Sequence, residues 1–219
     1  MAISVVRTQT GNIASASSGN ITLDCTGGNF VVIGWSAFDP TLANRTASTV
    51  TVGGSGATIV SGSKSDNTTS TGQTQLAFFV SPSSGNQTVT LTMGGTCTNV
   101  DWYASLLSGA KTTGQPDIQG NNTATAATSD TVTVTTTVAN AFLFDVMNGN
   151  SGPMSPGAGQ TSIMNLSGST GRGSYKDAGA AGSGKTMSYT TTGNDDYALS
   201  VIAVAPAATT VNSNFLMFM

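Results

Sequence analysis

The residue types that carry most enzyme chemistry are scarce in this chain of 219 residues. It has no histidine and no glutamate, so its ten acidic residues are all aspartates, opposed by seven lysines and arginines. Histidine is the side chain that titrates between about pH 5 and 8, and it is the commonest metal ligand. Its absence excludes a histidine-based catalytic triad and most hydrolase mechanisms. We therefore predict a protein that is not an enzyme and uses no cofactor.

One segment, GAAGSGKT at Gly179–Thr186, formally matches the phosphate-binding pattern G-x-x-x-x-G-K-[ST]. A true phosphate loop follows a buried strand and opens a helix, whose first amides face the phosphates. Here the following residues, MSYTTTGN, are rich in β-branched and aromatic types that disfavour a helix start. The segment is therefore predicted to be a glycine-rich turn before a strand.

The aspartates offer little basis for metal or acid–base chemistry. Asp195 and Asp196 are the only adjacent pair, and calcium needs about six to eight oxygen ligands. We interpret them mainly as part of a turn that starts the last core strand, with a metal site as the lesser alternative. Asp24, Asp101 and Asp145 lie in or beside apolar runs, where we expect them at strand edges or hydrogen-bonded to turns.

Two consecutive aromatic residues are the candidates for ligand contact. Trp102 and Tyr103 would face opposite sides of a strand, so one of them is expected to point outward. An outward ring could stack on a sugar, which makes glycans a candidate partner.

Cys25 and Cys97 are the only cysteines and lie 72 positions apart. Three interpretations remain open: two free core thiols, one disulfide, or one free and one buried thiol. A four-ligand metal site would need further ligands.

The composition favours strands, because good helix formers are rare and Thr, Ser, Gly, Val and Ala dominate. Apolar or alternating runs bounded by turn residues recur about every 8 to 12 residues, which predicts an all-β sandwich of roughly a dozen strands. The most apolar runs, at 29–38, 140–147 and 197–205, predict central strands.

The glycine-, serine- and proline-rich stretch 148–172 contains Met154, Ile163, Met164 and Leu166, so we expect it to pack onto the fold.

Five stretches of the chain share a common pattern of strands and turns: STVTVGGSGATIV, LAFFVSPSSGNQTVTLTMGG, WYASLLSGA, SDTVTVTTTVANAFLFDVM and SYKDAGAAGSGKTMSYTTTGNDDYALSVIAVAP. Together they resemble a mostly uncharacterised family of phage-encoded and bacterial surface modules with a jelly-roll, concanavalin-like β-sandwich. The resemblance covers about residues 29–206. It implies an antiparallel jelly-roll sandwich with no established active site, and family members tend to end near the residue equivalent to Pro206.

The chain is predicted to divide into a sandwich domain, 1–206, and a C-terminal tail or strand, 207–219. The tail ends in a continuous apolar cluster of Phe215, Leu216, Met217, Phe218 and Met219. An exposed cluster of this kind is an aggregation liability on a free monomer. It would either fold back as one more strand of its own sandwich or dock on a neighbouring subunit by strand addition or in a groove.

A net charge of −3 and a pI near 4.4 argue against nucleic acid as a partner, because binding to a duplex rests on basic residues. No run approaches the ~18 apolar residues of a membrane span, and the N-terminus lacks the pattern of a signal peptide. We therefore expect synthesis in a host cytoplasm and a place on a virion surface, as a capsid decoration, cement or fibre subunit. Its partner would be itself or a major capsid or other structural protein. The alternatives are an extracellular carbohydrate-binding or adhesive module and a self-assembling surface filament.

Overall fold

A computed structural model describes residues 1–69, 72–149, 153–166 and 171–208 of the chain. Two antiparallel sheets account for nearly all of its regular structure, together with a short helix α1 (Leu42–Arg45) and a 3-10 turn (Ser61–Ser63). The predicted all-β antiparallel sandwich is confirmed. No helix in the described part of the chain is long and apolar enough to cross a bilayer.

The first sheet comes from the N-terminal half, and its strand order is β4-β3-β8-β2-β7-β5. In addition, β1 pairs with β8 and β6 pairs with β7. The predicted central run at 29–38 forms β2, which lies between β8 and β7 and is almost wholly buried. The strands of this sheet are β1 (Ser4–Asp24), β2 (Phe30–Phe38), β3 (Ala47–Val52), β4 (Ser55–Gly56), β5 (Thr58–Ile59), β6 (Ser65–Asn67), β7 (Gly72–Val80) and β8 (Asn86–Ser108).

The second sheet comes from the C-terminal half, and its strand order is β11-β14-β10-β13-β12. In addition, β9 pairs with β14. The apolar run at 140–147 supplies β10 at the centre, and the run at 197–205 supplies the buried end of β14. The strands of this sheet are β9 (Ile118–Thr136), β10 (Phe142–Gly149), β11 (Ser155–Pro156), β12 (Thr161–Asn165), β13 (Gly171–Asp177) and β14 (Gly182–Val204).

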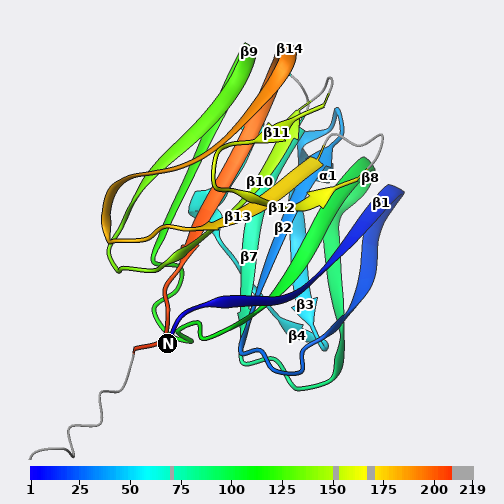
Figure 1. Cartoon of the computed structure of the whole chain (residues 1–219). Coiled ribbons are helices and arrows are strands. Elements are labelled where there is room, and N and C mark those ends of the chain that lie inside the picture. Colours follow the sequence, from blue (N-terminus) through cyan, green and yellow to red (C-terminus); the bar gives the residue numbers. More distant parts are fainter. Residues whose placement is uncertain (70–71, 150–152, 167–170, 209–219) are drawn as a thin grey trace, which may run out of the picture.

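The two halves repeat one arrangement of long and short strands (Figure 1). In the first half β1 pairs with β8, β8 with β2, and β2 with β7; in the second half β9 pairs with β14, β14 with β10, and β10 with β13. Each long first strand bends near its middle at a non-glycine residue with positive φ, Ser15 at 51° and Ala126 at 50°. The fold is thus two similar β units packed face to face.

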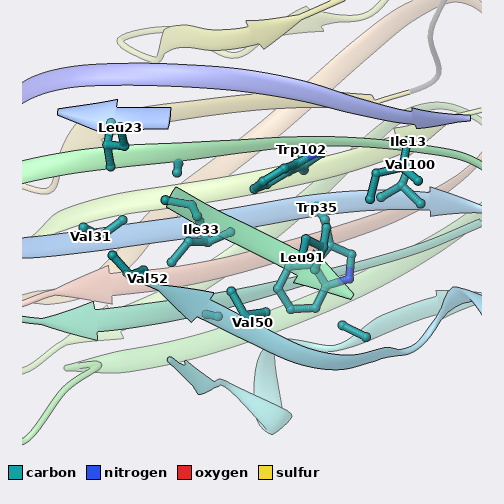
Figure 2. Close-up of a cluster of buried hydrophobic side chains, with 14 of the residues drawn as sticks. Ile13, Leu23, Val31, Ile33, Trp35, Val50, Val52, Leu91, Val100 and Trp102 are labelled. Atoms are coloured by element: carbon teal, nitrogen blue, oxygen red, sulfur yellow. The ribbon is translucent and has the colours of Figure 1, made fainter. Parts of the chain in front are cut away.

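The long strands explain why there are three apolar clusters rather than one. One cluster lies between the sheets and contains Phe30, Leu76, Tyr103 and Phe144. Each unit also encloses a cluster of its own, because its long strands curl over the opposite face of the sheet. Figure 2 shows the cluster of the first unit, in which the rings of Trp35 and Trp102 lie among aliphatic side chains.

The ring of Tyr103 occupies a slot between the sheets that two glycines make possible. A Cβ atom at Gly34, on the neighbouring strand β2, would lie 2.6 Å from the ring, and one at Gly173, on the opposite sheet, would lie 2.7 Å from it. Any side chain at either position would collide with the ring, since cores are close-packed. The Tyr103 hydroxyl crosses the interface and donates to the backbone oxygen of Asp145 at 2.9 Å.

Candidate assembly site at the terminal pole

The two ends of the described chain meet at one end of the sandwich, which we call the terminal pole (Figure 1). The N-terminal ammonium of Met1 donates to the backbone oxygen of Ala207 at 2.9 Å. The Ala207 amide donates to the oxygen of Gly109 at 2.7 Å, and the Lys111 amide donates to the oxygen of Ala205 at 2.9 Å. The backbone therefore fixes both termini in one place.

Two amide side chains hold this pole together. Asn29, just before β2, exchanges two hydrogen bonds with the backbone of Ala110: its Nδ2 donates at 2.6 Å and its Oδ1 accepts at 3.3 Å. Gln115 does the same with Ala205, donating at 3.0 Å and accepting at 3.1 Å. These bonds add to the backbone bridge between Ala110 and Pro206 and tie together the connections that meet at the pole.

The pole carries a groove of about 920 Å³. Its wall combines apolar side chains with one cation and one anion, Lys111 and Asp117. Val138, one of the few large apolar side chains that are exposed, is 36% accessible here. The apolar lining comes from Met1, Ala2, Val138, Ala139, Ala205, Pro206, Ala207 and Ala208.

The apolar cluster predicted to make assembly contacts, Phe215 to Met219, lies outside the described residues. Ala208, the last described residue, lines the groove. The described part of the chain therefore ends at the groove. The sequence analysis selected the tail but missed Asn29, Gln115 and Val138. Asn29 and Val138 lie at the ends of predicted strands and Gln115 lies in a connection, and nothing in the sequence marked them as neighbours.

The expectation that Trp102 or Tyr103 points outward is wrong. Trp102 is 1% exposed and Tyr103 is 0% exposed. The two rings do face opposite sides of β8, as predicted, but both sides are buried: one is the core of the first unit and the other the layer between the sheets. Neither ring is available to stack on a ligand.

Both cysteines are free and buried, so the interpretation as two core thiols holds and the disulfide does not. Burial raises the pKa of the Cys97 thiol to about 11, and a nearby carboxylate, Asp39, adds to the shift. Burial likewise raises the pKa of Cys25. A thiol that stays protonated at neutral pH is a poor nucleophile and a poor metal ligand.

Asp145 is fully buried in the second unit, contrary to the expectation of an edge position. Its carboxylate accepts from the Ser174 amide at 2.6 Å, the Ser174 hydroxyl at 2.9 Å, the Tyr189 hydroxyl at 2.9 Å and the Gln160 amide at 3.1 Å. Burial raises the pKa of this carboxyl to about 7, although the bonds from Ser174 and Tyr189 oppose the shift. Because the group is closed off from solvent, we assign it a structural role.

The other aspartates singled out in the sequence also make local contacts. Asp195 and Asp196 lie within β14 rather than in a turn before it, at the bend where the β9 register shifts. The Asp196 carboxylate accepts from the Ala126 amide at 2.9 Å. Asp101 is wholly buried and accepts from Asn12 at 2.8 Å. In the described ranges, no three Cys or Asp side chains gather as a metal site would require.

Two remaining expectations concern glycine-rich segments. The Gly179–Thr186 segment leads into a strand and not into a helix, as predicted, but only its first three residues precede β14, and Gly182 to Thr186 already belong to that strand. Gly179 and Gly184 have positive φ. Within the stretch 148–172, Met154 and Met164 are buried in two different clusters, so its described part packs onto the fold as expected.

The fold defines the chain as an antiparallel β-sandwich of two stacked units. No protein-family model matches the sequence, so the resemblance to phage-encoded and bacterial surface modules stays a prediction. No curated protein matches it either.

Among the solved structures that this chain resembles, three show the following weak similarity. The PBSX exported protein XepA is 11% identical, with a TM-score of 0.25 over 93% of this chain and 86% of that one. The major capsid protein P2 of bacteriophage PM2 is 6% identical, with a TM-score of 0.27 over 93% and 99%. A chain of Sulfolobus Turreted Icosahedral Virus is 8% identical, with a TM-score of 0.26 over 94% and 91%. Likeness at this level says nothing about function.

Proposed function

We propose that this chain is a non-enzymatic structural subunit of a virion surface that assembles with copies of itself through the terminal pole. The observation that carries the proposal is the meeting of three features there: the hydrogen-bonded ends of the described chain, the groove, and Ala208, the last described residue, in the wall of that groove. The apolar end of one subunit's tail would lie in the groove of its neighbour.

The dimensions of the tail are compatible with such an exchange. Eleven residues follow Ala208, and eleven residues span at most roughly 40 Å when extended. A tail of this length could extend from its own pole toward that of a neighbour. Burial of the five terminal apolar side chains in a partner would take them out of water and so favour assembly.

The low charge of the chain supports the same conclusion. Only 8% of its residues are charged, which gives weak electrostatic protection against self-association. The alternative of a carbohydrate-binding module loses its support, because the two rings that suggested it are buried.

A charge placed in the groove tests the proposal in the full-length chain. Val138→Asp would put an unpaired carboxylate against the apolar end of an incoming tail, and burying such a charge is costly. We expect sedimentation velocity to show assemblies for the wild type and monomers for Val138→Asp. Leu42→Asp is the matched control, since Leu42 is also an exposed apolar residue, 46% accessible, but lies in α1 away from the pole. Assembly by Val138→Asp at the wild-type level would contradict the proposal, as would a wild type that remains monomeric.

A further inference from the structure

Two lysines face the interior of the second unit at one of its ends. Lys176 of β13 pairs with Leu143, and Lys185 of β14 pairs with Val134. Both of these partners belong to the apolar cluster that the second unit encloses. Side chains that are paired across neighbouring strands point to the same face. Each lysine is therefore directed toward that cluster, and each is only partly exposed.

A short connection brings the two lysines together. Residues 178–181 join β13 to β14, so Lys176 lies just before the connection and Lys185 lies shortly after it. Gly184 has a φ of 75°, which glycine adopts without strain. Burial lowers the pKa of Lys176, the Asp145 carboxyl opposes this shift, and Lys185 adds to it. The two ammonium groups are therefore close enough to repel each other.

No carboxylate of the described residues pairs with these two charges. In that part of the chain, neither ammonium group makes an ion pair or a hydrogen bond. The Asp145 carboxyl is wholly buried, and its oxygens accept from Ser174 and Tyr189. Asp177 is exposed and accepts from a backbone amide of the connection at 2.8 Å. Charges that are partly withdrawn from water without a partner are costly, so this end of the unit favours a bound anion.

Thr136 adds a neutral hydrogen-bonding group at the same end. It pairs with Gly182 at the start of β14, and on β9 it continues the inward-facing series of Val132 and Val134. The side chain is 2% exposed, and its hydroxyl has no hydrogen-bond partner among the described residues. A buried hydroxyl without a partner is costly, and an oxygen atom of a bound anion would supply the missing partner.

We propose that Lys176, Lys185 and Thr136 form a binding site for a small oxyanion of the phosphate class. Each ammonium group would donate to an oxygen of the anion and balance its charge, and the Thr136 hydroxyl would donate to a third oxygen. The segment 179–186, which matches the phosphate-loop pattern, supplies Lys185 but no helix N-terminus, so side chains would hold the anion. The site goes beyond the proposed assembly role, since none of its three residues lines the groove.

Titration calorimetry of the purified full-length protein with sodium phosphate, at constant ionic strength in a buffer free of other oxyanions, tests this inference. We expect the wild type to bind a single phosphate per chain. Lys176→Gln and Lys185→Gln each remove a charge and a charge-assisted hydrogen bond, so each should weaken binding about tenfold or more. Lys64→Gln is the matched control and should bind as the wild type does, because Lys64 is also partly exposed but lies in the first unit, where it donates to Thr46.

Urea unfolding separates a lost ligand from a lost fold. Without phosphate, Lys176→Gln and Lys185→Gln should unfold at the same midpoint as the wild type or a higher one, because they relieve the repulsion between the two ammonium groups. Phosphate should raise the midpoint of the wild type, as a ligand of the native state does, and should leave that of both variants nearly unchanged.

Phenyl phosphate as a second probe identifies the form of the ligand. Tighter binding of phenyl phosphate than of inorganic phosphate would assign the site to an esterified phosphate, and weaker binding would assign it to the free ion. A wild type that binds neither probe would overturn the inference. Binding of phosphate to Lys185→Gln as tightly as to the wild type would overturn it too.

Discussion

Replacing Tyr103 with alanine is expected to destabilise the protein by about 3 to 5 kcal/mol, the usual cost of removing a large buried aromatic side chain. The ring is wholly buried between the two units. Gly34 and Gly173 flank it from the two sheets, and neither has a side chain that could move in to fill the space. Urea unfolding followed by tryptophan fluorescence measures the loss, since Trp35 and Trp102 are both buried.

The conservative variant Tyr103→Phe separates the ring from its hydroxyl. It keeps the packing and loses only the bond to the Asp145 backbone oxygen, so we expect a cost of about 1 kcal/mol. If Tyr103→Ala cost no more than Tyr103→Phe, the ring would not be what holds the two units together.

The second large effect is a dependence of stability on pH caused by Asp145. Burial raises the pKa of its carboxyl from 3.8 to about 7 in the native state. Between these values the native state holds a proton that the unfolded state has lost, so the free energy of unfolding falls as pH rises. A shift of about three pK units corresponds to on the order of 4 kcal/mol, fully present below pH 4 and lost by about pH 7.

Three titratable groups interact electrostatically with the Asp145 carboxyl. Lys176 lowers the pKa of this carboxyl because it favours the charged form. The other two groups are the buried tyrosines Tyr103 and Tyr189. Burial raises the pKa of both tyrosines far above neutrality, so they stay protonated in this range. Burial also raises the pKa of the Asp130 carboxyl, so both carboxyls contribute to the pH dependence above pH 4, and the larger shift, that of Asp145, gives the larger part.

Urea unfolding at several pH values checks this assignment. The wild type should lose stability from pH 4.5 to pH 8, and Asp145→Asn should flatten that slope because the amide does not ionise. Asp24→Asn is the control: the pKa of the exposed Asp24 carboxyl is lowered by hydrogen bonds from Thr26, so its contribution changes only below about pH 4. An unchanged slope in Asp145→Asn would show that the carboxyl is already ionised throughout.

The sequence predicted the class of fold because local patterns determine it. The clean alternation in Thr88 to Thr92 and in Thr131 to Val134 reports one buried and one exposed face. The apolar runs of β2, β10 and β14 report strands at the centre of each unit.

The lengths of the strands could not be predicted in the same way. Gly94–Gly95 and Gly193–Asn194 resemble turns, yet β8 and β14 continue through them, and β14 shifts its register against β9 there. A Gly-Gly or Gly-Asn pair permits either a turn or a bend within a strand, and only the partner strand decides which one forms.

The failures at individual residues have a related cause. An alternating pattern assumes that one face of a strand meets water, but the end of β8 is covered on both sides, so Trp102 and Tyr103 are both buried. Asp145 interrupts an apolar run and was expected at a strand edge or hydrogen-bonded to a turn. Its partners Ser174, Tyr189 and Gln160 come from three other segments that only the fold brings together.

The measurement that tests assembly through the terminal pole most directly compares the full-length chain with a chain that ends at Ala208. The shorter chain keeps every hydrogen bond of the described residues at the pole, including those of Ala207, so it should still fold cooperatively. Sedimentation velocity should then show assemblies for the full-length chain and monomers for the shorter one. A shorter chain that folds and assembles as fully as the full-length protein would contradict the proposed role of the tail.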